Sequence, residues 1–211
     1  MARILITSGP TRQYLDPVRY LTNASSGRMG KALAEAALSD GHDVIVVSGP
    51  VQVRYPEAAQ IIPVISTEEM LTAAREIFST CDGLIGAAAP CDYRPTHVEP
   101  GKIAKTGQPL QLHLVETDDI VASLAATKDQ RWVVGFALET DDHRLRALAK
   151  LQRKCCDLMV SNGVEAMHAT DNQVEILDPT GTILEQVAGS KEYVAERILA
   201  VVGQQLISHQ G

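Results

Sequence analysis

This sequence of 211 residues lacks the features that mark several classes of protein. It has no excess of positive charge, because 19 lysines and arginines stand against 26 aspartates and glutamates, and the net charge of −7 argues against a nucleic-acid-binding surface. It also has no apolar run long enough for a membrane span and no signal-peptide profile. These absences predict a cytoplasmic protein that binds neither nucleic acid nor membranes.

Cysteine and histidine show no metal-binding spacing. The four cysteines include no C-x-x-C pair, and the six histidines include no H-x-x-x-H pair. Reduced and mostly buried thiols are therefore expected, as in other cytosolic proteins. Internal repeats and low-complexity linkers are also absent, and 45% of the residues are apolar. We interpret residues 1–211 as a single folded α/β domain.

Strand and helix patterns alternate through the first two thirds of the chain. Buried strands are predicted at residues 4–7, 44–47, 63–65, 83–89, 132–136 and 158–160, and helices at 30–38, from 67 onward, at 119–126 and at 142–154. This alternation predicts a doubly wound, mostly parallel, Rossmann-like sheet with helices on both faces. Residues 95–114 are interpreted as a loop followed by an exposed strand or flap, whose apolar alternation also suits a subunit interface. A hairpin at 174–187 and a helix at 192–207 are expected to follow.

The segment between the first strand and the first helix contains polar groups that a core does not need. Arg12, Arg19 and Asn23 lie in it, and Gly27 and Gly30 form a turn where the helix begins. A helix N-terminus carries unpaired N–H groups and a partial positive charge, so it binds phosphate or carboxylate. The segment is therefore predicted to be a long polar loop that binds an anionic small molecule.

A nicotinamide-dependent oxidoreductase is one alternative, but the glycine pattern fits it poorly. Gly27 and Gly30 supply only part of a G-x-G-x-x-G motif, and they lie about twenty residues beyond the first strand. The acidic residue expected after the second strand is replaced by Ser48-Gly49-Pro50. A non-catalytic nucleotide-binding module is the other alternative.

Several motifs occur in order along the chain: Thr11-Arg12, Asp16-Pro17-Val18-Arg19, Asn23 with Ser25-Ser26-Gly27-x-Met29-Gly30, Asp92-Tyr93-Arg94-Pro95, Lys102-Ile103 with Lys105, and Gly135-Phe136-Ala137 with Glu139-Thr140. Together they resemble phosphopantothenoylcysteine synthetase over nearly the whole chain. The resemblance implies a ligase of coenzyme A biosynthesis that condenses 4'-phosphopantothenate with cysteine through an acyl-cytidylate, converting CTP to CMP and pyrophosphate. It further implies a need for Mg²⁺ and a homodimer formed through the flap strand region.

The resemblance covers the synthetase alone, either as a monofunctional protein or as an excised domain. No flavin is therefore expected, and a separate phosphopantothenoylcysteine decarboxylase is a candidate partner. Thr117-Asp118 departs from the Asn-Pro or Thr-Pro that is frequent in the family. An extra carboxylate near a triphosphate is unfavourable unless it faces solvent or Mg²⁺, so the choice between CTP and ATP stays open. The Mg²⁺ ligands are not identified by the sequence.

The resemblance also implies roles for individual residues. Asn23 would donate a hydrogen bond to the reacting carbonyl oxygen, Lys102 would cover the triphosphate, and Arg19 would bind phosphate or carboxylate. The phosphopantothenate site is expected at Arg19, Asn23, Ser26, Gly27 and Gly30. The nucleotide site is expected at Gly86, Ala87, Ala88, Asp92, Lys102, Thr117, Asp118, Asp119, Ile120, Phe136, Lys150 and Lys154.

Simpler interpretations exist for some of these residues. Ser25 or Ser26 would act as an ordinary cap of the first helix. Lys105 would be a solvated charge. Lys150 and Lys154, four residues apart on one helix face, would form a solvated basic surface.

Overall fold

A mixed sheet forms the centre of the computed structural model, which describes residues 1–139, 143–163 and 172–208. Within these residues, eight strands are hydrogen-bonded in the order β12-β11-β10-β9-β6-β1-β4-β5. The parallel strands are β1 (Arg3–Ser8), β4 (Asp43–Ser48), β5 (Gln60–Pro63), β6 (Gly83–Gly86), β9 (Trp132–Glu139) and β10 (Leu158–Gly163). The antiparallel hairpin at one edge is formed by β11 (Asn172–Leu177) and β12 (Ile183–Gly189). The predicted mostly parallel sheet with a C-terminal hairpin is confirmed.

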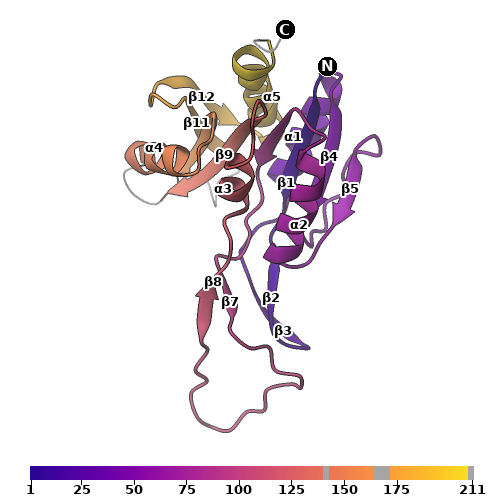
Figure 1. Ribbon diagram of the computed structural model, residues 1–211, viewed down its shortest axis with the longest axis vertical. Coiled ribbons are helices and arrows are strands. Elements are labelled where there is room, and N and C mark those ends of the chain that lie inside the picture. Colours follow the sequence, from indigo (N-terminus) through magenta and orange to yellow (C-terminus); the bar gives the residue numbers. More distant parts are fainter. Residues whose placement is uncertain (140–142, 164–171, 209–211) are drawn as a thin grey trace.

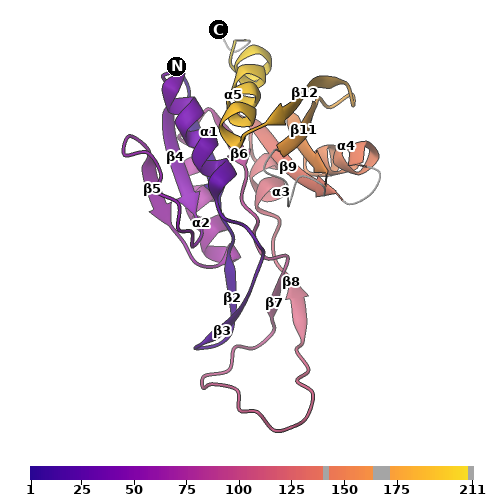
Figure 2. The ribbon, with the colours of Figure 1, turned by 180° about the vertical axis from the view of Figure 1, so that it is seen from behind.

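Helices cover both faces of the sheet (Figures 1 and 2). One face carries α1 (Arg28–Ser39) and α5 (Lys191–Val202), which continues as a π-helical turn over Gly203–Ile207. The other face carries α2 (Thr67–Phe78), α3 (Ile120–Ala125) and α4 (His143–Arg153). Among the described residues, no helix combines the length and apolar character needed to cross a membrane.

The core lies on both sides of the sheet because successive strand residues point to opposite faces. In β1, Ile4 and Ile6 pack into the cluster beneath α1 and α5, and Leu5 packs into the cluster on the opposite face. All three side chains are fully buried. Burial of apolar surface contributes roughly 25 cal/mol per Å², so two such layers are the main source of stability for this part of the chain.

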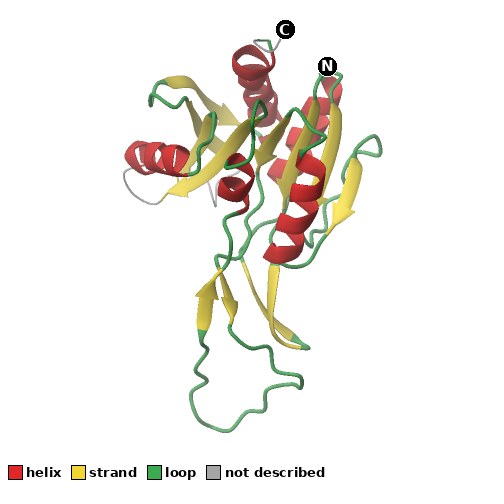
Figure 3. Cartoon of the chain, in the orientation of Figure 1, coloured by secondary structure: helices red, strands yellow, loops and turns green. Residues whose placement is uncertain are grey.

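An arm projects from the carboxyl edge of the sheet (Figures 1 and 3). It consists of the hairpin β2 (Arg12–Asp16) and β3 (Arg19–Thr22), the two-stranded ladder β7 (Tyr93–Pro95) and β8 (Leu114–Glu116), and residues 96–113, which we call the flap. Strands β2 and β7 lie beside each other. All three residues of β8 are exposed. The predicted loop is confirmed over residues 96–113, but the exposed strand begins only at Leu114, at the end of the predicted range.

The segment after β1 is not the long polar loop that the sequence predicts. It forms the β2–β3 hairpin because side chains interact across the two strands. The rings of Tyr14 and Tyr20 meet edge to face at 5.4 Å, and the Arg12 guanidinium lies 4.5 Å from the centre of the Tyr20 ring. The carboxylate of Asp16 accepts two backbone N–H bonds within the turn. Arginine and aspartate are poor strand signals, so the polar composition concealed the hairpin.

Of two predicted element boundaries, that of the third parallel strand is wrong and that of the second helix is confirmed. The third parallel strand is Gln60–Pro63, not 63–65, and it ends at a proline, which has no N–H for the ladder. Helix α2 begins at Thr67 as predicted, because Ser66 and Glu69 form a capping box around its first turn.

Candidate active site

A cavity of about 650 Å³ lies at the carboxyl edge of the sheet, beside α3 and the end of α4. Its lining comprises Thr7, Gly86, Ala88, Pro90, Cys91, Asp92, Tyr93, Glu116, Thr117, Asp118, Asp119, Ile120, Val121, Ala122, Phe136, Arg153 and Lys154. Most of the residues predicted to bind a nucleotide are in this wall, and the volume is within the range of small-molecule sites. The carboxyl edge is also where ligands of parallel sheets bind.

Small residues at the end of β6 shape this wall. A Cβ on Gly86 would lie 2.5 Å from a methyl group of Val121, so α3 can pack this close only on a glycine. Ala88 continues the wall, whereas the Ala87 side chain packs on the opposite face, against the core beneath α1 and α5. Neighbouring residues of an extended chain point to opposite sides, so the Ala87 side chain does not line the cavity, although Ala87 was predicted to belong to the nucleotide site.

Acidic side chains are prominent in the cavity wall. Asp92, Glu116 and Asp118 are all exposed there. In the part of the chain that the structure describes, no group of three or more acidic, histidine or cysteine side chains is arranged to hold a metal ion. An entering triphosphate would be repelled by these carboxylates unless a cation accompanied it.

The basic side chains of the wall come from the end of α4. Lys154 pairs with Asp119 at 3.0 Å, and Asp119 also caps α3 by accepting the backbone N–H of Ala122 at 3.0 Å. Arg153 lines the cavity too, although the sequence analysis did not single it out. The sequence could have indicated Arg153, because this residue directly precedes Lys154, a predicted nucleotide-binding residue. Lys154 is held by an acidic partner, so the interpretation as a merely solvated charge is wrong for this residue.

Three threonine hydroxyls hold the backbone of Cys91 in the wall. Thr11 Oγ1 accepts the Cys91 N–H at 2.8 Å, and the hydroxyls of Thr67 and Thr117 donate to the Cys91 carbonyl at 3.2 and 2.6 Å. Burial raises the pKa of the Cys91 thiol, so the thiol is neutral near pH 7 and is not poised as a nucleophile. Thr11 was noted only as part of a family motif, and of the three threonines only Thr117 was predicted to be a site residue.

Asn23 connects the segment before α1 to the cavity. Its side-chain Nδ2 donates to the carbonyl of Pro90 at 2.9 Å, and Pro90 lines the cavity. Asn23 is exposed, so its amide is accessible at the edge of the site. The structure thus brings this predicted catalytic residue to the cavity rim.

The N-terminus of α1 has the glycine geometry expected of a tight turn. Gly27 is the N-cap with φ +73° and provides no side-chain cap, so capping by Ser25 or Ser26 is not what begins the helix. A Cβ on Gly30 would lie 2.0 Å from the Ser8 hydroxyl, so Gly30 is required for packing α1 on β1. Ser26 is exposed beside this turn. The first N–H groups of a helix have no partner within the helix, so the start of this 12-residue helix suits an anion.

A hydroxyl network beneath this turn was missed by the sequence analysis. The Tyr55 hydroxyl bonds to Ser8 Oγ at 2.8 Å and to Ser48 Oγ at 2.9 Å. Ser8 Oγ lies 3.4 Å from the Gly27 carbonyl, which it contacts as a donor. The network ties the ends of β1 and β4 to the start of α1. Because Tyr55 lies in an irregular loop, no periodicity marks it.

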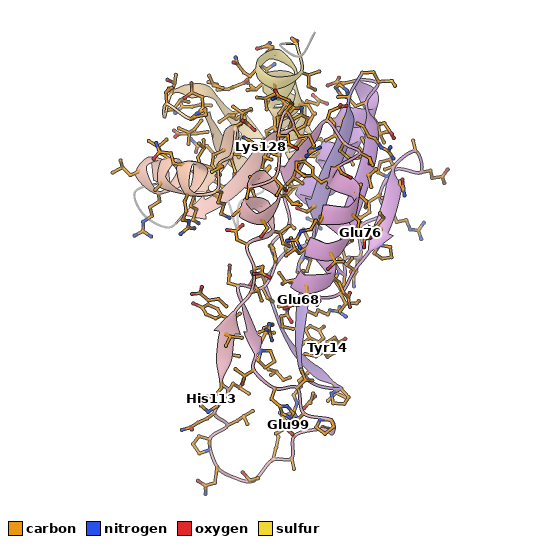
Figure 4. The ribbon with its side chains drawn as sticks, in the orientation of Figure 1. Tyr14, Glu68, Glu76, Glu99, His113 and Lys128 are labelled. Carbon is orange, nitrogen blue, oxygen red and sulfur yellow. The ribbon has the colours of Figure 1, made fainter. Side chains whose placement is uncertain are left out.

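The remaining predicted residues lie outside the cavity wall. Arg19 is bound to Asp16, with Nε 2.8 Å and Nη2 2.6 Å from Oδ2. Lys102 and Lys105 are exposed on the flap. Figure 4 shows the flap residues Glu99 and His113 on the arm, away from Lys128 of the main body. Lys150 is half-buried on α4 and also lies outside the wall. Thr140 and Asp142, which belong to a quoted motif and to the start of the predicted basic helix, lie outside the described residues.

Comparisons with known proteins agree over nearly the whole chain. The family model for the DNA/pantothenate metabolism flavoprotein C-terminal domain matches residues 1–206. The coenzyme A biosynthesis bifunctional protein CoaBC of Vibrio vulnificus is 42% identical over 185 residues, which are 84% of this chain and 46% of that protein. CoaBC of Escherichia coli is 45% identical over 165 residues, 76% of this chain and 41% of that protein. The chain spans about half the length of the curated relatives it matches. The crystal structure of a CoaBC C-terminal domain matches with a TM-score of 0.84 at 35% identity, covering 98% of this chain and 96% of that domain.

Proposed function

Because the chain belongs to the family of DNA/pantothenate metabolism flavoprotein C-terminal domains, we propose that it is a phosphopantothenoylcysteine synthetase of coenzyme A biosynthesis. The observation that carries the proposal is the cavity at the sheet edge, whose wall gathers most of the predicted nucleotide residues while Asn23 is bonded to its rim. The relatives named for coenzyme A biosynthesis support the same pathway.

The proposed reaction has two steps. The carboxylate of 4'-phosphopantothenate attacks the α-phosphate of CTP, and the bond to the leaving pyrophosphate breaks. The amine of cysteine then attacks the acyl-cytidylate, forming the amide with loss of a proton and releasing CMP. Every participant is an anion or carries a carboxylate, so the protein must supply donors and cations at the reacting groups.

Three residues of this chain have proposed roles in those steps. Asn23 donates a hydrogen bond to the carbonyl oxygen as negative charge develops on it, which a neutral amide does without pairing permanently with phosphate. Lys102 neutralises the triphosphate, and Arg19 binds the phosphate or carboxylate of phosphopantothenate. The α1 N-terminus at Gly27 supports the second anion site, because helix N-termini bind phosphate.

Mg²⁺ is proposed to arrive with the nucleotide. The wall carboxylates of Asp92 and Asp118 are hard oxygen donors that fit this ion. They do not make a protein-only cage, which agrees with an ion held mainly by phosphates. Bound there, Mg²⁺ would offset the charge of the triphosphate against the acidic wall.

A homodimer formed through the arm is also proposed. Exposed apolar side chains concentrate there: Val18, Tyr20, Tyr93, Val98, Leu110, Leu112, Leu114 and Val115. Such a patch on an extended arm favours association with a second apolar surface. Analytical ultracentrifugation should give a dimer that Leu112→Asp weakens about tenfold or more, since burying a charge at an interface is unfavourable. Leu145→Asp on α4 is the control, because Leu145 is 72% exposed outside the arm. Equal sedimentation of both variants as dimers would contradict an interface at Leu112.

The cellular setting follows from the same proposal. The relatives are bifunctional proteins about twice as long as the matched segment. A phosphopantothenoylcysteine decarboxylase, on this or on another chain, is the proposed partner that consumes the product. The synthetase itself needs no flavin, and its substrates are expected in the cytoplasm.

Pyrophosphate release tests the proposed function and its nucleotide. The purified chain is supplied with 4'-phosphopantothenate, cysteine and Mg²⁺, with CTP in one reaction and ATP in another. Release with CTP and little with ATP is expected. Release with ATP alone would keep the ligase and attribute the changed base preference to Thr117 and Asp118. A chain that binds CTP without releasing pyrophosphate would instead be a non-catalytic nucleotide-binding module.

A further inference from the structure

Asp16 is a fully buried carboxylate at the turn between β2 and β3. Its Oδ1 accepts the backbone N–H groups of Val18 at 2.9 Å and of Arg19 at 2.8 Å. Its Oδ2 accepts Arg19 Nε at 2.8 Å and the backbone N–H of Ile103 at 3.1 Å. One oxygen therefore holds the hairpin turn, and the other faces Arg19 and the flap.

The flap residue Ile103 is bound through both of its backbone groups. Its N–H donates to Asp16 Oδ2, and its carbonyl accepts Arg19 Nη2 at 2.6 Å. Ile103 directly follows Lys102, so the chain that carries this lysine is tied to the hairpin at the next residue. A second backbone bond, from the Glu99 N–H to a β2 carbonyl at 3.0 Å, supports the same docking.

We infer that Asp16 and Arg19 form a latch that docks the flap on the β2–β3 hairpin and thereby positions Lys102. The docking stands on the hydrogen bonds of Ile103, and only the role of Lys102 rests on the proposed function. Asp16 is buried and does not line the cavity, so it acts through the flap and is a positioning residue.

The latch requires a carboxylate at this position. Burial alone would raise the pKa of Asp16, but hydrogen bonds from Val18, Ile103 and Arg19 hold it well below its ordinary value. The group is thus ionised at neutral pH and offers only acceptors to donors that all point toward it. A neutral amide would keep one oxygen for the turn and present its own N–H groups to Ile103 and Arg19.

The test uses Asp16→Asn, which keeps the Oδ1 bonds and removes the Oδ2 acceptor. Hydrogen exchange of the peptide spanning residues 99–105 should become about tenfold faster or more, because charge-assisted bonds to a buried group are lost. Exchange in the sheet strands should stay unchanged. Pyrophosphate release should slow as in Lys102→Ala, and the double variant should be little slower than either single one.

Asp178→Asn is the matched control. The Asp178 carboxylate holds the β11–β12 turn in the same manner, accepting the N–H groups of Thr180 and Thr182, both at 2.9 Å. It lies far from the flap in the chain and in the fold, so its substitution should leave flap exchange unchanged. Should Asp16→Asn fail to fold, Ile103→Pro removes the flap N–H at a half-buried loop residue outside the hydrophobic core. Because proline also replaces the side chain and restricts the backbone of Lys102, flap exchange and not activity is the readout for this variant.

Hydrogen exchange of the flap tests the latch, and pyrophosphate release tests the proposed function, so the two can fail independently. Unchanged flap exchange in Asp16→Asn, or in Ile103→Pro where the first variant does not fold, overturns the latch whatever the activity is. A loosened flap with normal pyrophosphate release overturns the positioning of Lys102. If the wild-type chain releases no pyrophosphate, the proposed function fails, while flap exchange still decides whether the latch exists.

Discussion

The main body and the arm of this molecule are stabilised in different ways. In the body, strands such as β1 bury every side chain from Ile4 to Ile6 between two layers of helices. In the arm, β8 is exposed throughout, and the flap is held by bonds to Asp16 and Arg19. The comparison teaches that burial determines the body, whereas a few side-chain contacts and hydrogen bonds determine the arm, where the proposed catalytic lysine lies.

The largest effect is expected where the two regions meet. Asn23→Ala should slow amide formation about 10²- to 10³-fold, as the loss of one oxyanion donor usually does. The acyl-nucleotide should accumulate, because Asn23 is assigned to the second step, and rapid quench with mass spectrometry would detect it. Wild-type turnover in this variant would remove Asn23 from the mechanism.

A pair of glycines tests the comparison directly. Gly30→Ala in the body places a Cβ 2.0 Å from the Ser8 hydroxyl, so it should lower the free energy of unfolding by about 3 kcal/mol, the upper range of overpacking costs. Gly101→Ala in the flap meets nothing within 4 Å and should change it by less than about 0.5 kcal/mol. Urea denaturation measures both. Equal losses would show that the arm is as tightly packed as the body.

Two flap lysines test whether the arm contacts the triphosphate through Lys102 alone. Lys102→Ala should slow pyrophosphate release about 10- to 100-fold, the range for losing a hydrogen bond to a charged group. Lys105→Ala removes the same charge three residues further along the exposed flap and should have a smaller effect. Stopped-flow detection of pyrophosphate gives both rates. A larger loss of rate for Lys105→Ala than for Lys102→Ala would show that the triphosphate had been assigned to the wrong lysine.

The body was predictable from sequence because apolar periodicity reports burial. The runs at Ile4, Val44 and Trp132 became parallel strands, and the cavity formed where their carboxyl ends meet. The arm was only partly predictable, since the β2–β3 hairpin depends on contacts such as Tyr14 with Tyr20 that leave no periodic signal.

The candidate site likewise contains residues that the sequence predicted and residues that it did not. Motif residues such as Asp92 and Phe136 line the cavity, and Ala87 does not because its side chain packs on the other face. Tyr55 was missed because a position in an irregular loop leaves no periodic signal, whereas Arg153 was missed although it directly precedes Lys154 in the sequence. Arg19 was predicted for its charge, but its hold on the flap depends on an Asp16–Ile103 contact between distant segments.

Product analysis of the wild-type chain tests the central claim most directly. With CTP, Mg²⁺, 4'-phosphopantothenate and cysteine, mass spectrometry should find phosphopantothenoylcysteine and CMP formed one for one. Omitting cysteine should leave the acyl-cytidylate as the only new acyl species. Unchanged substrates alongside measurable CTP binding would contradict the ligase and leave the cavity as a nucleotide-binding site without this chemistry.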